Sequence, residues 1–123
     1  MDVKRFWKMV LEQDREHLPA FFEEGAWINW HNTDECFTVA EFVRANCDYP
    51  GQWDGEVERI EAYGDRIITV THVYDRDRTA SFHAVSFFEI KDGKIASLDE
   101  YWGDDGEAPQ WRQEMHIGSR IRN

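Results

Sequence analysis

The segment from Ser81 to Trp102 constrains the fold of this chain more than any other feature. Apolar residues alternate with polar ones on both sides of Asp92-Gly93, and such a pair favours a tight turn between antiparallel strands. The segment therefore predicts a β-hairpin that joins a strand over Thr79–Lys91 to a strand over Lys94–Trp102. Histidine, acidic and aromatic residues replace aliphatic ones along it, so one face of the hairpin is expected to line a polar-tipped pocket.

Amphipathic helices precede these strands. Apolar residues recur with a helical period over Val3–Leu11, which predicts a helix, and a shorter helix is expected over Arg15–Phe22. A strand over Ala26–His31 follows, and Thr38-Val39-Ala40-Glu41 is a capping box that opens a third helix ending near Cys47. The other expected elements are strands over Glu56–Tyr63 and Arg66–Asp75, an acidic loop over Gly103–Glu107, and a short helix or turn from Pro109.

This order of elements predicts one α+β domain over residues 1–123. Helices followed by successive antiparallel strands place the N-terminal helices on one face of a strongly curved, mostly antiparallel sheet. Such a sheet, closed on one side by helices, forms a cone, and a small-molecule site is expected in its internal cavity. With 123 residues, the chain is long enough for one modest core and too short for a second domain.

Charge and composition narrow the possible partners. The chain has 25 acidic and 14 basic residues, a formal net charge of −11, which repels nucleic acid and anionic membrane surfaces. No apolar run approaches the ~20 residues of a membrane span, and the N-terminus lacks a signal-peptide core, so a cytoplasmic location is expected. Cys36 and Cys47 have no paired-thiol spacing, and two buried free thiols are expected.

Strand parity decides which polar side chains share a face, because successive side chains alternate. If Asp92-Gly93 forms a two-residue turn, His83 lies opposite Trp102. If Arg76-Asp77 is likewise a two-residue turn, His72 and Tyr74 of the preceding strand lie on the same face as His83. That face then carries His72, Tyr74, His83, Glu100 and Trp102. A three-residue turn with a glycine bulge would instead shift the pairing by one and move His83 toward Tyr101, so both registers stay open.

A histidine beside a carboxylate can act as a general base. The carboxylate orients the ring and stabilises its charged form. His83 is therefore a candidate base that Glu100 orients, and His72 is a further candidate on the same face. The alternative is structural: a buried histidine can pair with an acid only to satisfy its hydrogen bonds, and His72 can be a half-exposed sheet residue.

Ligand contacts are expected from side chains near the ends of the strands and of the third helix. Asn46 continues the apolar stripe of that helix, and it either ties down the helix end or donates to a ligand oxygen in the cavity. Six Trp, eight Phe and four Tyr favour flat walls, and Trp27, Trp30 and Trp53 are expected in a wall or the core. The candidate ligand-binding residues are Asn46, Trp30, Asp99, Tyr101 and Trp102.

Nothing in the spacing predicts a metal or a cofactor. No histidine pair has the helical spacing of metal ligands, no cysteine pair has zinc spacing, and no phosphate-binding glycine loop or nucleophile elbow is present. Asp104, Asp105 and Glu107 lack calcium-loop spacing, so a solvated acidic loop is expected. Any catalysis is therefore expected to be acid–base chemistry.

The chain resembles the nuclear transport factor two-like superfamily, and within it the SnoaL-like branch. The resemblance rests on the helical N-terminus, on Phe21-Phe22 before the first strand, on Lys91-Asp92-Gly93-Lys94-Ile95 and on Glu100-Tyr101-Trp102. It implies an α+β cone with a hydrophobic cavity and frequent dimerisation through the sheet. Members include ketosteroid isomerases, polyketide cyclases, dehydratases and epoxide hydrolases, alongside non-catalytic transport and binding modules.

Three functions follow as hypotheses. The first is a cone that binds an apolar, carbonyl-bearing small molecule and acts on it as a cofactor-independent isomerase, dehydratase or cyclase, in which Asn46 or Tyr101 polarises an oxygen. The second is a non-catalytic binding module. The third is an interaction or assembly domain whose aromatic-rich sheet face pairs with a second copy, as a homodimer, or with another protein.

Overall fold

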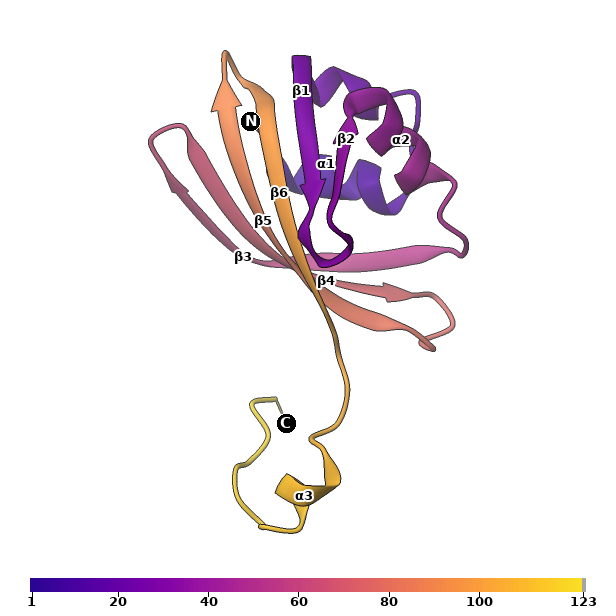
Figure 1. Ribbon diagram of the computed structural model, residues 1–123, viewed down its shortest axis with the longest axis vertical. Coiled ribbons are helices and arrows are strands. Elements are labelled where there is room, and N and C mark those ends of the chain that lie inside the picture. The colour runs from indigo at the N-terminus through magenta and orange to yellow at the C-terminus, as the bar shows by residue number, and fades with distance from the viewer. Residues whose placement is uncertain (123) are drawn as a thin grey trace.

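The computed structural model describes residues 1–122, which form helices packed on one face of a curved, six-stranded sheet (Figure 1). The strand order is β2-β1-β6-β5-β4-β3. The pairing of β1 with β6 is parallel and the other pairings are antiparallel. The expected α+β cone is therefore confirmed. The strands are β1 Phe22–Trp30, β2 Glu35–Thr38, β3 Trp53–Tyr63, β4 Arg66–Asp75, β5 Ser81–Lys91 and β6 Lys94–Asp104.

The helices are α1 (Val3–Leu11), α2 (Val39–Cys47) and a short α3 (Gln110–Gln113). The side chain of Asp2 accepts a hydrogen bond from the Arg5 backbone and caps α1, and both bonds of the expected capping box are present at the start of α2. Helices α1 and α2 cover the concave face of the sheet, whereas α3 lies apart from them beyond β6 (Figure 1). Among the described residues, no helix combines the length and apolar character that a membrane crossing requires.

One local prediction is wrong, and one strand was missed. The helix expected over Arg15–Phe22 is only a 3-10 turn over Leu18–Phe21, followed at once by β1. The core explains the early strand, because Phe22 is buried at 4% exposure and its ring packs edge-on against Phe6 at 5.8 Å. Strand β2 was not predicted at all, because four residues with only Phe37 half-buried show little alternation.

The core lies between the concave face and the two helices. Phe6 on α1 has no exposed surface, and its ring makes edge-to-face contacts with Phe21, Phe22 and Phe88. Such contacts are worth about 0.5–1.5 kcal/mol beyond the buried area. The aromatic load of the sequence is thus used partly to fix α1 on the sheet.

The β5–β6 register differs from the one expected from the turn. Lys91 pairs with Lys94 around Asp92-Gly93 as expected, and both turn residues have positive φ. However, Ala96 is bulged out between the pairs Ile90–Ile95 and Glu89–Ser97, which moves every later pair by one. His83 therefore lies opposite Gly103 and not Trp102 or Tyr101, and Glu100 lies opposite Ser86.

The bulge divides the predicted polar face in two. Glu100 and Trp102 lie on the concave face with Ser86 and Phe88, while His83 lies on the convex face. The expected pair of His83 with Glu100 is therefore wrong. The β4–β5 parity is as expected, because His72 pairs directly with His83.

The cysteine prediction holds in part. Both thiols are free, but Cys36 is exposed on β2 and only Cys47 is partly buried. Burial raises the pKa of the Cys47 thiol. Trp27 is 42% exposed, so the expectation that it lies in a wall or in the core is wrong.

Candidate functional site

A cavity of about 350 Å³ lies between α1, the residues that follow α2, and the concave face of the sheet. Its wall is mainly aromatic, and five of the aromatic residues form a continuous series. Tyr49 packs against Trp53 at 5.5 Å, Trp53 against Phe82 at 5.5 Å, Phe82 against Trp102 at 4.8 Å and Trp102 against Trp30 at 6.3 Å. These ring contacts hold one another in place, so the wall is preformed.

The side-chain amides of Asn46 and Gln13, which line the cavity, already donate hydrogen bonds to backbone carbonyls. The Asn46 side chain donates to the Val10 carbonyl at 3.0 Å, and Gln13 donates to the carbonyls of Asn46 and Tyr49. Asn46 therefore ties the end of α2 to α1, which is the first of the two roles expected for it from the sequence. Its side chain also lines the cavity. Its carbonyl oxygen side makes no hydrogen bond to another described residue.

The mouth of the cavity is acidic. Glu35 and Asp104 contribute carboxylates to the lining, and none of the described lining residues is Lys, Arg or His. Asn32 connects the mouth of the cavity to its aromatic wall. Its side chain donates a hydrogen bond to the Trp102 carbonyl and accepts one from the Trp102 N–H, both at 2.7 Å. The cavity is therefore apolar inside and negative at its entrance.

Glu100 lies on the cavity side of β6, behind the Trp30 indole. Its side chain is almost completely buried, at 2% exposure, and no basic side chain within residues 1–122 pairs with it. The Trp30 indole N–H donates to Oε1 at 3.2 Å and the Ser86 hydroxyl donates to Oε2 at 2.6 Å. Burial raises the pKa of Glu100 to about 7, and these two hydrogen bonds offset only part of that effect. Glu100 can therefore give or take a proton near neutral pH.

Other polar groups share this face of the sheet. The Trp7 indole N–H donates to the Thr69 hydroxyl at 3.2 Å, which fixes α1 over β4. The buried Thr71 hydroxyl has no hydrogen-bond partner among the described residues. The interior of the cone thus contains more polar groups than a simple hydrophobic core would need.

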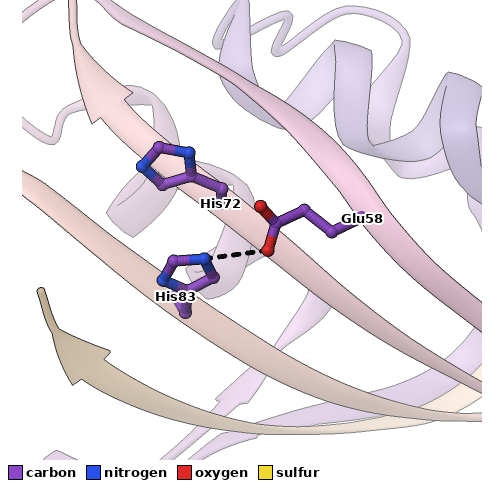
Figure 2. A group of neighbouring side chains, drawn as sticks. All are labelled: Glu58, His72 and His83. Carbon is purple, nitrogen blue, oxygen red and sulfur yellow. Dashed lines mark hydrogen bonds and ion pairs between the residues drawn. The ribbon is translucent and has the colours of Figure 1, made fainter. Parts of the chain in front are cut away.

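The convex face carries a second polar cluster, the histidine cluster, made of Glu58, His72, His83, Asp105 and Ser81. His72 and His83 stack at 4.8 Å with their rings 10° from parallel. His83 Nε2 lies 2.9 Å from Glu58 Oε1 and its Nδ1 lies 2.5 Å from Asp105 Oδ1. Figure 2 shows Glu58, His72 and His83 converging from three adjacent strands.

The charges in this cluster reinforce each other. For His83, desolvation opposes the charged form, but hydrogen bonds and charge from Asp105 and Glu58 prevail and raise its pKa. For Asp105, desolvation is likewise outweighed by hydrogen bonds from Ser81 and His83, which lower its pKa. His83 thus meets acids as expected, although these are Asp105 and Glu58.

The structure separates the predicted site residues into two groups. Trp30, Trp102 and Asn46 line the cavity, and Glu100 lies directly behind it. His72, His83, Asp99 and Tyr101 lie on the convex face. There Asp99 accepts hydrogen bonds from Asn29 and His31, and Tyr101 stacks on His31 at 4.2 Å.

Several residues of the two sites were missed. Phe82 and Tyr49 belong to the cavity wall, and only the correct register or the path of the loop after α2 could have placed them. Glu58 and Asp105 belong to the histidine cluster. Asp105 follows another acid in an acidic loop, and Glu58 alternates with other residues along a strand rich in charged residues. Both patterns resemble an ordinary solvated surface, so the sequence contains no signal that distinguishes these two residues.

Comparisons with known proteins agree with this architecture. A family model described as a SnoaL-like domain matches residues 3–98, whereas no curated protein matches the sequence. A protein from Kribbella flavida DSM 17836, assigned as a ketosteroid isomerase, is 25% identical with a TM-score of 0.78, and the match covers 98% of this chain and 87% of that chain.

Two further structures share the fold at lower identity. A nuclear transport factor two-like protein of unknown function from Burkholderia xenovorans LB400 has a TM-score of 0.77 at 21% identity, over 96% of this chain and 91% of that chain. An LEH-like epoxide hydrolase from M. tuberculosis has a TM-score of 0.69 at 15% identity, over 82% and 79% of the two chains. The same architecture therefore occurs in proteins that are assigned different activities.

Proposed function

Because this chain belongs to the SnoaL-like domain family, we propose that it binds a flat, apolar small molecule in the cavity of the cone. The observation that carries the proposal is the continuous aromatic wall from Tyr49 to Trp30 around about 350 Å³. Ligand sites are concave and largely apolar, and 300 Å³ is about the lower limit of their usual size. Fixed aromatic rings favour a planar ligand that stacks on them.

Charge restricts the ligand further. Glu35 and Asp104 at the mouth, together with a net charge of −11 for the chain, disfavour anions. The proposed ligand is therefore neutral or cationic.

A binding titration tests this proposal. The probe is Prodan, a neutral naphthyl ketone whose fluorescence reports an apolar site. Wild-type protein is expected to bind it, Trp102→Ala is expected to bind it at least about tenfold more weakly, since a lost aromatic contact costs about 1.4 kcal/mol or more, and Trp27→Ala is the matched control on an exposed tryptophan. Equal binding by the wild type and Trp102→Ala contradicts the proposal.

Acid–base catalysis on the bound molecule is a second candidate function. The observation that favours it is Glu100, a buried carboxyl with a pKa of about 7 behind the cavity wall. Glu100 is hydrogen-bonded to the Trp30 indole and does not itself line the cavity, so this role requires the indole to move aside and let the carboxylate reach the ligand. With a β,γ-unsaturated ketone, the carboxylate would then take a proton from the α-carbon and return it to the γ-carbon, which conjugates the alkene with the carbonyl. The assignment of the Kribbella protein as a ketosteroid isomerase is consistent with this chemistry.

The test uses 3-cyclohexenone, because its conversion to 2-cyclohexenone is followed by ultraviolet absorbance. The wild-type rate is expected to rise with pH through about 7, as Glu100 becomes the carboxylate base. Glu100→Gln keeps the shape of the side chain and removes the base, so it is expected to abolish the rate. An unchanged rate in Glu100→Gln rules out this role while the binding proposal stands.

We also propose that the protein forms a homodimer and is cytoplasmic, as the resemblance and composition lead us to expect. Static light scattering on the purified protein tests the dimer, and a mass of one chain at high concentration contradicts it.

A further inference from the structure

The histidine cluster on the convex face lies on the opposite side of the sheet from the cavity, so the proposed ligand site does not explain it. One ligand atom from each of Glu58, His72 and His83 lies within 4.8 Å of the others. The three side chains come from β3, β4 and β5 and point toward one another (Figure 2). The cluster is therefore built across three strands that follow one another in the chain and lie side by side in the sheet.

Glu58 reaches the cluster through an irregularity of β3. The β3–β4 pairing shifts between Val57 and Arg59, so Glu58 is the extra residue of a β-bulge. Bulges interrupt the ladder and re-aim a side chain, and they are frequent next to functional sites. His72 and His83, by contrast, face each other as a regular cross-strand pair.

In His72 and His83, one ring nitrogen forms a hydrogen bond to Ser81 or Asp105. This bond determines which of the two nitrogens carries the proton and which keeps a lone pair. Asp105 is an acceptor, so His83 Nδ1 carries a proton toward it. The Ser81 hydroxyl donates to Asp105 Oδ2 at 2.6 Å, so it accepts from His72 Nε2 at 2.8 Å. In the neutral rings, His83 Nε2 and His72 Nδ1 are therefore left as lone pairs.

These lone pairs face carboxylates. His83 Nε2 lies 2.9 Å from Glu58 Oε1, and His72 Nδ1 lies 3.9 Å from the carboxylate of Glu56. A lone pair beside a carboxylate oxygen is repulsive, so each contact needs a positive charge between the two atoms: either a proton on the ring, which makes the nitrogen a donor, or a metal ion in its place. Arg122 partly meets this need, because its guanidinium lies 3.1 Å from the other oxygen of Glu58, but its side chain is 71% exposed.

We propose that Glu58, His72 and His83 form a binding site for a divalent transition-metal ion, with zinc as the best match. Two imidazoles and one carboxylate, with a fourth position open to solvent, form a three-ligand set that zinc accepts. Ligand atoms around a tetrahedral zinc ion lie about 3.3 Å apart. The His83–Glu58 pair at 2.9 Å is already close to this separation, and the remaining atoms, all within 4.8 Å of one another, must draw together to bind the ion. The three side chains are 24%, 22% and 27% exposed, which leaves room for an ion to enter.

Asp105 has a separate role in this site as a positioning residue. It holds His83 directly and His72 through Ser81. Metal-bound histidines usually donate their other N–H to a carboxylate or a similar acceptor, and loss of this partner costs about 10–100-fold in affinity.

Isothermal titration of tag-free protein, stripped with a chelator and then titrated with ZnCl₂, tests the proposal. One zinc ion is expected to bind per chain, and MgCl₂, which prefers oxygen ligands, is expected to give no binding. Asp105→Asn is expected to bind zinc about 10–100-fold more weakly, and Glu58→Gln more weakly still. His31→Ala is the matched control, since it removes another histidine of the convex face that pairs with an acid.

Two readouts separate binding from folding and from other sites. Far-ultraviolet circular dichroism is recorded for each variant, and cobalt substitution is expected to give the visible bands of a four-coordinate site in wild-type protein. If wild-type protein binds no zinc, the cluster is only an imidazolium paired with acids and the proposal fails. If Glu58→Gln binds as tightly as wild type, the zinc lies elsewhere and the proposal also fails.

Discussion

The two faces of this sheet treat ionisable side chains in opposite ways. On the concave face, Glu100 is buried with only neutral donors, and its pKa rises to about 7. On the convex face, Asp105 is partly exposed next to His83 and Ser81, and its pKa falls. The comparison shows that the partner and the degree of burial, more than the residue type, determine which form of a carboxyl is favoured.

The largest expected effect is on stability, because only the concave face packs against the core. Phe87 and Phe88 are adjacent on β5, but Phe88 has no exposed surface while Phe87 is only half-buried on the other face. Phe88→Ala is expected to lower the free energy of unfolding by about 3–5 kcal/mol, and Phe87→Ala by much less. Urea denaturation measures both variants. Equal losses would contradict the assignment of the concave face as the core side.

The next effect concerns the pH dependence of stability. The pKa of Glu100 is about 7 in the folded state against 4.5 for an ordinary Glu, so between these values the folded state binds the extra proton. Stability therefore falls as pH rises through this window, by about 3 kcal/mol in total, since each pKa unit is about 1.4 kcal/mol.

Glu100→Gln is expected to remove this dependence, because the amide does not ionise. The difference between the free energies of unfolding of Glu100→Gln and the wild type should grow in favour of the variant from pH 4.5 to pH 8. A difference that stays constant over this range would show that Glu100 has an ordinary pKa. Glu35→Gln, at an exposed carboxylate of the rim, is the control.

The smallest effect concerns the histidine cluster. Asp105→Asn is expected to lower the pKa of His83, because it removes the carboxylate that stabilises the charged ring. The titration of the His83 ring signals by NMR in metal-free protein measures this shift. The His31 signals serve as the internal control. An unchanged His83 titration would mean that Asp105 does not act on this ring.

The sequence was sufficient for the α+β cone and insufficient for which residues share each face of its sheet. The period of α1, the capping box at Thr38 and the Asp92-Gly93 turn are local signals, and each is confirmed. The residues around Ala96 do not indicate a bulge. Its position depends on how side chains pack across the whole sheet, which the local sequence does not specify. One bulged residue was enough to exchange Glu100 for Asp105 as the partner of His83.

The sites illustrate the same limit. Trp30 and Trp102 were predicted as ligand contacts and do line the cavity, since large aromatic residues near strand ends often form walls. The contact of Glu100 with the Trp30 indole depends on the parallel pairing of β1 with β6, and the sequence did not predict this pairing. Glu58 joins His83 through a second bulge, which spacing rules cannot reveal.

The most direct test of the cavity as the ligand site is a ¹H–¹⁵N spectrum of the six tryptophan indoles, recorded with and without Prodan. The account predicts that the signals of Trp30, Trp53 and Trp102, which line the cavity, shift on binding. The exposed Trp27 and Trp111 should not shift. Shifts confined to Trp27 and Trp111 would place the ligand on the outer surface and contradict the account.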